Sequence, residues 1–299
     1  MNQSHTLGES DLEAIKRDGI VKKDRFFSAG MIDQIAETTI RLRHHALPHR
    51  KPARKWILVS PLNALARNIR SETRAGLSDL SGIALQCGFK EFSSLYLEGP
   101  AWLSHIMSIE YPASDEPITP WHTDDNSPSE ANIYPPNFFT LKFFIYLNDV
   151  DSTNGAFAYV RGSHRLVVAI RESIYRRRIP FCKTRDIADI RAACENPQVA
   201  HAILKTVSRQ DIDDFMSATE DLSDESESPE LDLIGPAGTL LVFDDRGMHR
   251  GGIPRGGHRS ILRYNYVLRE YWGMDLSRTR YMLNMAARAL LPRIMSAHW

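Results

Sequence analysis

Apolar and polar residues alternate along several short segments in the middle and the second half of the chain. Alternation with a period of two is typical of β-strands. Turn-forming residues separate these segments by mostly short gaps, which favours an antiparallel sandwich or barrel over β-α-β units. The predicted strands span Ser104–Tyr111, Asn137–Leu147, Ala156–Val160, Thr239–Phe243 and Arg259–Leu268.

Helical patterns lie at both ends of the chain. Ser10 is a predicted helix cap, and Gly19 is predicted to end that helix before an extended segment begins at Ile20. Ser28 is the predicted cap of a second helix. Residues 282–291 carry apolar side chains at helical spacing, so we expect a helix there, packed on the outside of the core.

A long segment from about Leu166 to Asp232 interrupts the strand pattern. It includes predicted helices over Asp186–Ala193 and Gln198–Val207, and it ends in an acidic, serine-rich run, Glu220–Glu230, that reads as a loop. Such a segment is either an active-site lid or a surface insertion. We therefore expect residues 1–299 to form a single domain with a helical and acidic insertion at about 166–232.

Charge and composition narrow the possible functions. Lys and Arg total 37, as do Asp and Glu, so the formal net charge is zero. Electrostatic binding of nucleic acid or of an anionic membrane by the chain as a whole is therefore not expected. There is no long apolar run and no signal pattern, and the 3 cysteines favour a reduced compartment. We expect a cytoplasmic monomer or homodimer.

The basic stretch Arg41–Lys55 is either a solvated helix end and loop or a contact surface for an anionic substrate tail.

The chemistry-bearing residues begin with His122 and Asp124. Two residues apart on a strand end, their side chains point the same way and could chelate one metal ion. The pair alone is a weak signal, because a metal site needs a third ligand. His249, which follows an apolar strand and precedes a glycine turn, is the candidate. Two imidazoles and one carboxylate on one face of a metal leave open positions, as in non-haem Fe(II) oxygenases. Asp244 or Asp245 is a candidate for orienting a metal-bound histidine.

A 2-oxoglutarate cosubstrate would also need a cation for its distal carboxylate. Arg259 is favoured over Arg255 because it lies on a predicted strand rather than in a turn. Alternation places Arg259, Arg263 and Asn265 on one strand face, which is polar enough to line a wet cavity. The corresponding face of the preceding long strand carries Thr140, Lys142, Phe144 and Tyr146.

Taken together, the motifs resemble the phytanoyl-CoA dioxygenase family of Fe(II)/2-oxoglutarate oxygenases. The resemblance runs through most of the chain, in the family's order. It departs at Gly251, where family members often have a small hydroxyl residue, and at Arg161, where proline is usual. The matching motifs are Asp18–Val21, His122–Asp124, Tyr146–Val150, Asn154–Gly155, Gly162–Arg165, Gly238–Leu240, His249 and Arg259.

The resemblance implies a mainly β fold with flanking helices: a double-stranded β-helix, or cupin-like jelly roll. It implies that His122, Asp124 and His249 bind Fe(II) as the catalytic triad and that Arg259 binds 2-oxoglutarate. Phe144 would lie beside the cosubstrate, with Lys142 and Thr140 as further candidate contacts. Candidate substrate contacts are Arg263, Asn265, Trp121 and Tyr146. Related halogenases carry Gly or Ala at the position of Asp124, so oxygenation is favoured over halogenation.

The expected function is oxidation by O₂, most simply hydroxylation, of an unactivated C–H bond in a small molecule, with release of succinate and CO₂. The substrate would fit secondary metabolism or an acyl conjugate. Desaturation, epoxidation and cyclisation remain open, because the same oxidant serves all of them. The alternative is a cupin-like metal-dependent hydrolase or isomerase, or a non-catalytic binding protein of the same fold.

Overall fold

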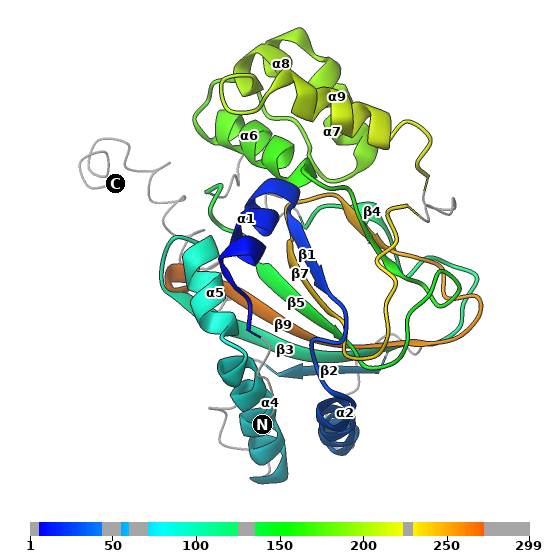
Figure 1. Ribbon diagram of the computed structural model, residues 1–299. Helices are drawn as coiled ribbons and strands as arrows, with labels where there is room; N and C mark the ends of the chain where they lie inside the picture. Colours follow the sequence, from blue (N-terminus) through cyan, green and yellow to red (C-terminus); the bar gives the residue numbers. More distant parts are fainter. Residues whose placement is uncertain (1–5, 44–54, 60–70, 125–134, 224–229, 272–299) are drawn as a thin grey trace, which may run out of the picture.

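The computed structural model describes residues 6–43, 55–59, 71–124, 135–223 and 230–271, and its strands form two antiparallel sheets (Figure 1). The larger sheet has six strands in the order β1-β7-β5-β9-β3-β2. These are β1 (Ile20–Lys23), β7 (Leu240–Asp244), β5 (Leu141–Tyr146), β9 (Arg259–Leu268), β3 (Ala101–Tyr111) and β2 (Lys55–Val59). The smaller sheet has three strands, β4 (Thr119–His122), β8 (His249–Gly251) and β6 (Phe157–Tyr159), in that order.

The two sheets pack face to face. Phe144 and Phe243 of the larger sheet share one buried cluster with Phe157 and Tyr159 of the smaller sheet. The ring centroids of Phe144 and Phe157 lie 5.4 Å apart, in an edge-to-face arrangement that aromatic pairs favour. This is the arrangement expected of a double-stranded β-helix, and the predicted fold class is confirmed.

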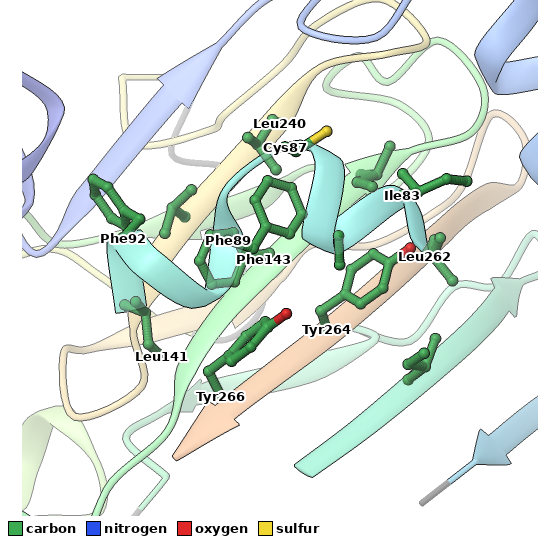
Figure 2. Packing of buried hydrophobic residues seen from close by; sticks show 14 of the residues in the cluster. Ile83, Cys87, Phe89, Phe92, Leu141, Phe143, Leu240, Leu262, Tyr264 and Tyr266 are labelled. Carbon is green, nitrogen blue, oxygen red and sulfur yellow. The ribbon is translucent and has the colours of Figure 1, made fainter. Parts of the chain in front are cut away.

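Helices cover the outer face of the larger sheet. They are α1 (Glu9–Asp18), α2 (Ala29–Arg43), α4 (Ser71–Gln86) and α5 (Phe89–Tyr96). Phe89 of α5 stacks on Phe143 of β5 with ring centroids 4.3 Å apart, and Tyr264 and Tyr266 of β9 lie beside them (Figure 2). The alternation predicted for β5 and β9 holds, because Phe143 and Tyr264 face the helices while Phe144 faces the smaller sheet.

A second group of helices covers the smaller sheet. These are α6 (Ser163–Tyr175), α7 (Ile187–Glu195), α8 (Pro197–Ile203) and α9 (Arg209–Ala218), which lie together at the top of Figure 1. Their apolar side chains form one buried cluster with Trp121, Ala158 and Met248 from the smaller sheet and its turns. The predicted helices at 186–193 and 198–207 correspond to α7 and α8.

The structure differs from the expected elements in detail. Helix α1 begins at Glu9, with Gly8 rather than Ser10 as its cap, because the Asp11 carboxylate accepts a hydrogen bond from the Gly8 N–H at 3.0 Å. Strand β3 begins at Ala101, and a register shift near Ser104 interrupts its pairing with β9. The short strands β2 and β8 and the helices α4 and α5 were not predicted, whereas β4 ends at His122, where the end of a strand was expected.

Some expectations fall outside the described residues. These concern the helix at 282–291, residues 44–54 of the basic stretch, and residues 224–229 of the acidic run. Among the described helices, none is both long and apolar enough to cross a membrane.

Helix α4 offers a matched test of the packing on the larger sheet. Leu80 is 2% exposed, whereas Leu85, on the same helix, is 62% exposed. We expect Leu80→Ala to lower the free energy of unfolding by about 2–5 kcal/mol, because it leaves a cavity in the core. Leu85→Ala should change it by about 0.5 kcal/mol or less. Urea denaturation measures both, and equal effects would contradict the packing described here.

Candidate metal and cosubstrate site

Cross-strand pairing brings the two predicted metal-binding histidines together. His122 ends β4, His249 begins β8, and the two residues are direct partners in the antiparallel ladder. Their ring centroids lie 4.4 Å apart. The chain then turns so that the Asp124 N–H donates to the Asp245 carbonyl at 2.9 Å, and the Asp124 carboxylate faces both rings.

Each imidazole ring is held by the nitrogen that faces away from Asp124. Nδ1 of His122 lies 2.7 Å from the Pro120 carbonyl oxygen, and Nδ1 of His249 lies 2.8 Å from that of Gly247. A carbonyl oxygen only accepts hydrogen bonds, so Nδ1 carries the proton and Nε2 presents its lone pair. Asp244 and Asp245 therefore do not orient these rings through Nδ1, contrary to expectation.

The remaining ligand atoms converge on one point. Nε2 of His122 lies 3.8 Å from one Asp124 carboxylate oxygen, and Nε2 of His249 lies 3.6 Å from the other. The possible ligand atoms of the three residues all lie within 4.8 Å of one another. Two imidazole nitrogens and a carboxylate at this spacing fit a divalent transition-metal ion such as Fe(II).

The ionisation states suit metal binding. Burial, with His122 as a further cause, lowers the pKa of His249 to about 3, so its ring is neutral at physiological pH. Burial alone would raise the pKa of Asp124, but Lys142 and the two histidines hold it below its usual range. Asp124 is therefore ionised. A neutral imidazole and a carboxylate are the forms that bind a metal.

Lys142 lies against this triad rather than standing apart from it. Its Nζ contacts the Asp124 carboxylate and lies 3.7 Å from that of Asp245. Asp245 accepts a hydrogen bond from the Thr140 backbone N–H at 3.1 Å. Burial raises the pKa of Asp245 to about 7, although Lys142 opposes the shift. The candidates Lys142 and Thr140 thus both reach the region of Asp124, one directly and the other through Asp245.

Asp244 has a different partner from its neighbour. Its carboxylate is fully buried, pairs with the Arg246 guanidinium at 2.5 Å, and accepts a hydrogen bond from the Tyr96 hydroxyl at 2.7 Å. The Arg246 guanidinium also lies over the Phe139 ring, 3.4 Å from its centroid. This buried pair ties the turn between β7 and β8 to helix α5, which fixes the start of the strand that carries His249.

Arg259 is buried beside the segment that follows His249. It is 2% exposed, it donates a hydrogen bond to the Gly155 carbonyl, and it stacks over Tyr111 at 4.9 Å from the ring centroid. A Cβ atom on Gly251 would lie 3.1 Å from a terminal nitrogen of Arg259. Arg255, the alternative, is exposed. Of these two arginines, Arg259 is the one turned toward the space between the sheets.

The other candidates divide into two groups. Phe144 packs between Phe157 and Phe243, and Tyr146 donates its hydroxyl proton to the Leu233 carbonyl at 2.7 Å. Arg263 and Asn265 lie on the same β9 face as Arg259, which meets the smaller sheet. Trp121, by contrast, packs among the α6–α9 helices, on the face of the smaller sheet opposite to His122.

Several contacts at the site were not predicted. The Pro120 and Gly247 carbonyls, the Gly155 carbonyl and the Tyr111 ring hold the key side chains, yet none carries a signal that sequence alone reveals. Thr119 is a partial exception. Its hydroxyl oxygen accepts a hydrogen bond from the Gly251 N–H at 2.9 Å, so a hydroxyl lies beside Gly251 after all, supplied by the neighbouring strand.

Comparison with known proteins agrees with this geometry. The family model of phytanoyl-CoA dioxygenase (PhyH) matches residues 15–260. The chain belongs to the phytanoyl-CoA dioxygenase family. Membership in this family indicates an iron- and 2-oxoglutarate-dependent enzyme. A search of curated proteins finds no match.

Solved structures show the shared fold at low sequence identity. HygX from Streptomyces hygroscopicus, with nickel and 2-oxoglutarate bound, is 15% identical over 89% of each chain, with a TM-score of 0.52. The iron-bound form of HygX is 14% identical over 89% of each chain, with a TM-score of 0.50. EctD from S. alaskensis, with 2-oxoglutarate and 5-hydroxyectoine, is 15% identical over 90% of this chain and 78% of that chain, with a TM-score of 0.50.

Gly251 gives a test of the packing beside Arg259. A Cβ atom there would lie 2.8 Å from Ile118, which is too close for an ordinary contact, whereas a Cβ on Gly257 would meet its nearest atom at 3.7 Å. We expect Gly251→Ala to lower the free energy of unfolding by about 1–3 kcal/mol through overpacking. Gly257→Ala is the control and should have little effect. Chemical denaturation of both variants checks the difference.

Proposed function

We propose that this chain is an Fe(II)/2-oxoglutarate-dependent dioxygenase that hydroxylates an unactivated C–H bond of a small molecule. The main support for this proposal is that ligand atoms of two imidazoles and of the Asp124 carboxylate lie within 4.8 Å of one another. In this proposal His122, Asp124 and His249 hold the iron. Three protein ligands would leave coordination positions for a chelating cosubstrate and O₂.

Arg259 receives the distal carboxylate of 2-oxoglutarate. A guanidinium and a carboxylate form a charge-assisted, two-pronged contact, and this one is buried, where such contacts are strong. Phe144 packs against Phe157, whose ring lies 5.5 Å from that of His249, and Lys142 and Thr140 shape the environment of Asp124. When bound, the iron supplies the oxidising chemistry: one oxygen atom of O₂ enters the substrate as a hydroxyl group and the other enters succinate, with CO₂ released.

The protein's own contribution is orientation and exclusion of water. Phe157 and Phe243 lie 5.5 and 5.4 Å from the His249 ring, measured between centroids, and form an apolar wall on that side of the triad. Such walls strengthen electrostatic interactions and protect a reactive oxidant from water. Asp124 fills the position that a halide would need, so hydroxylation is the reaction we favour over halogenation.

A small-molecule substrate is part of the proposal, supported by the fold shared with EctD, whose structure holds 5-hydroxyectoine. We also propose that residues 1–299 act as one catalytic domain. In it, helices α6–α9 belong to a segment inserted between two strands of the common fold.

Metal binding tests the triad. Under nitrogen, the wild-type protein should bind one equivalent of Co(II), with visible absorption bands typical of mixed nitrogen and oxygen ligands. His122→Ala and Asp124→Asn should each lose this spectrum, because each removes one of three ligands. The exposed His201 on helix α8 gives the matched control: His201→Ala should bind as wild type does. Undiminished binding in both triad variants would contradict the assignment.

Cosubstrate binding tests Arg259. Anaerobic Fe(II) and 2-oxoglutarate should produce the weak visible charge-transfer band of the chelate. Arg259→Met should raise the dissociation constant of 2-oxoglutarate roughly 10- to 100-fold, since hydrogen bonds to charged groups are worth about 1.5–3 kcal/mol. Arg255→Met should leave it unchanged. If the iron-loaded wild type shows no band, the hydrolase, isomerase or binding-protein alternative takes precedence.

A further inference from the structure

The inner face of the larger sheet is polar at the end that adjoins the triad. On this face, strand register places Asn265 of β9 beside Lys142 of β5, and Arg263 beside Phe144. Lys142 in turn contacts Asp124, a proposed metal ligand. Asn265 is therefore separated from the triad by one side chain, that of Lys142. Arg263 lies one row further from Lys142, on the way to Arg259. Two arginines therefore lie on one strand face between the sheets.

Arg263 forms no direct ion pair with a carboxylate of the residues that the structure describes, although Asp124 and Asp245 act on it electrostatically from a distance. One terminal nitrogen contacts the Met107 sulfur, and the guanidinium lies over the Phe144 ring, 5.9 Å from its centroid. Its buried Nε has no hydrogen-bond partner within the described part of the chain. A thioether is a weak acceptor. Burial lowers the pKa of Arg263, although Tyr111, Asp124 and Asp245 oppose the shift. A guanidinium that has no direct ion pair between two sheets keeps part of its desolvation cost in the ligand-free fold.

Asn265, one row closer to the triad, is also incompletely satisfied. It is 7% exposed, and its buried Oδ1 accepts no hydrogen bond from any described residue. Buried polar atoms in folded proteins are nearly always paired. Among the described residues, a guanidinium without a direct ion pair and an amide oxygen without a donor thus lie at neighbouring positions on the same face of β9.

We propose that Arg263 and Asn265 form a subsite for a carboxylate-bearing substrate. In it, Arg263 pairs with the substrate carboxylate and the Asn265 oxygen accepts a hydrogen bond from a substrate hydroxyl or N–H group. This proposal rests on the proposed function. Lys142 makes the direct contacts to the Asp124 and Asp245 carboxylates, whereas the Arg263 guanidinium lies farther from them and is available for direct pairing with one carboxylate. The guanidinium fork matches a carboxylate geometrically.

The cosubstrate does not account for Arg263. 2-Oxoglutarate has two carboxylates: one belongs to the chelate at the metal and the other to Arg259. A third anion-binding position on the same face therefore belongs to the second organic ligand of the reaction. The primary substrates are therefore molecules whose carboxylate reaches Arg263 when the carbon to be oxidised lies at the metal.

The test uses simple carboxylates as probes, each beside its neutral primary amide: butyrate with butyramide, and hexanoate with hexanamide. They are added under nitrogen to the full chain loaded with Fe(II) and 2-oxoglutarate. Thermal unfolding and the charge-transfer band are the two readouts. We expect the carboxylates, but not the amides, to raise the unfolding midpoint and perturb the band. Arg263→Met should weaken carboxylate binding about tenfold or more, the loss of one charged contact.

Two further measurements separate a binding role from a structural one. The ligand-free Arg263→Met protein should unfold at a temperature no lower than that of the wild type, because the substitution removes a partly buried guanidinium that has no direct ion pair among the described residues. Its dissociation constant for 2-oxoglutarate should stay within about twofold of the wild-type value, a difference well under 1.4 kcal/mol. Arg255→Met, which changes an exposed arginine in the same hairpin, is the matched control for both.

Three results would overturn the proposal. The first is a loss of 2-oxoglutarate affinity in Arg263→Met as large as that in Arg259→Met, which would assign Arg263 to the cosubstrate. The second is a lower unfolding temperature of Arg263→Met, which would make the residue structural. The third is stabilisation of the wild type by none of the carboxylates. Absence of the charge-transfer band in the wild type would instead refute the proposed function, and the thermal measurements would still test Arg263.

Discussion

The pairing of His122 with His249 across two short antiparallel strands is the constraint on which the site depends. Backbone hydrogen bonds set this register, and a shift by one residue would turn one imidazole to the opposite face of the sheet. The carbonyls of Pro120 and Gly247 then fix the ring orientation from behind. The third group, Asp124, is held by a hydrogen bond from its backbone N–H to the Asp245 carbonyl. The Asp245 carboxylate in turn accepts a hydrogen bond from the backbone N–H of Thr140, just before β5. The triad is thus anchored to both sheets.

The ionisable groups around the triad are stabilised by the charged and polar groups that face them. Asp124 faces Lys142 and the two imidazole rings, and Asp244 faces Arg246 and the Tyr96 hydroxyl, so each of these two carboxylates has a cation beside it. The Asp244–Arg246 pair lies in surroundings of low dielectric constant, and removal of either member would leave the other buried without compensation. The charge pattern therefore limits substitution near the triad as much as the hydrophobic packing does.

Sequence alone predicted the strands with clear alternation and the residues with distinctive chemistry. The two faces of β5 and β9 were separated correctly because every second residue of each strand enters a different core. His122, Asp124 and His249 were found from residue type and from a family resemblance, and the structure brings them together. Strand register, the irregularity near Ser104 and the carbonyl partners of the imidazoles were not predictable, since they depend on contacts between segments far apart in the chain. Alternation did contain one unused signal: it places Trp121 on the face opposite to His122, among the helices, as the structure does.

Strand β9 shows how packing and function divide a single segment. Its helix-facing residues, Leu262, Tyr264 and Tyr266, follow the ordinary rules of a hydrophobic core. On its other face, Arg259 and Arg263 lie between two sheets where aliphatic side chains of similar size would stabilise the fold more. A chain selected for stability alone would not place two guanidinium groups there, and proteins tolerate such costs mainly where binding or catalysis requires them. Arg259 offsets part of the cost through the Gly155 carbonyl and the Tyr111 ring. Within the described residues, Arg263 contacts a thioether and lies over an aromatic ring, with the Asp124 and Asp245 carboxylates farther away, so a bound carboxylate would give it the direct ion pair that the fold does not.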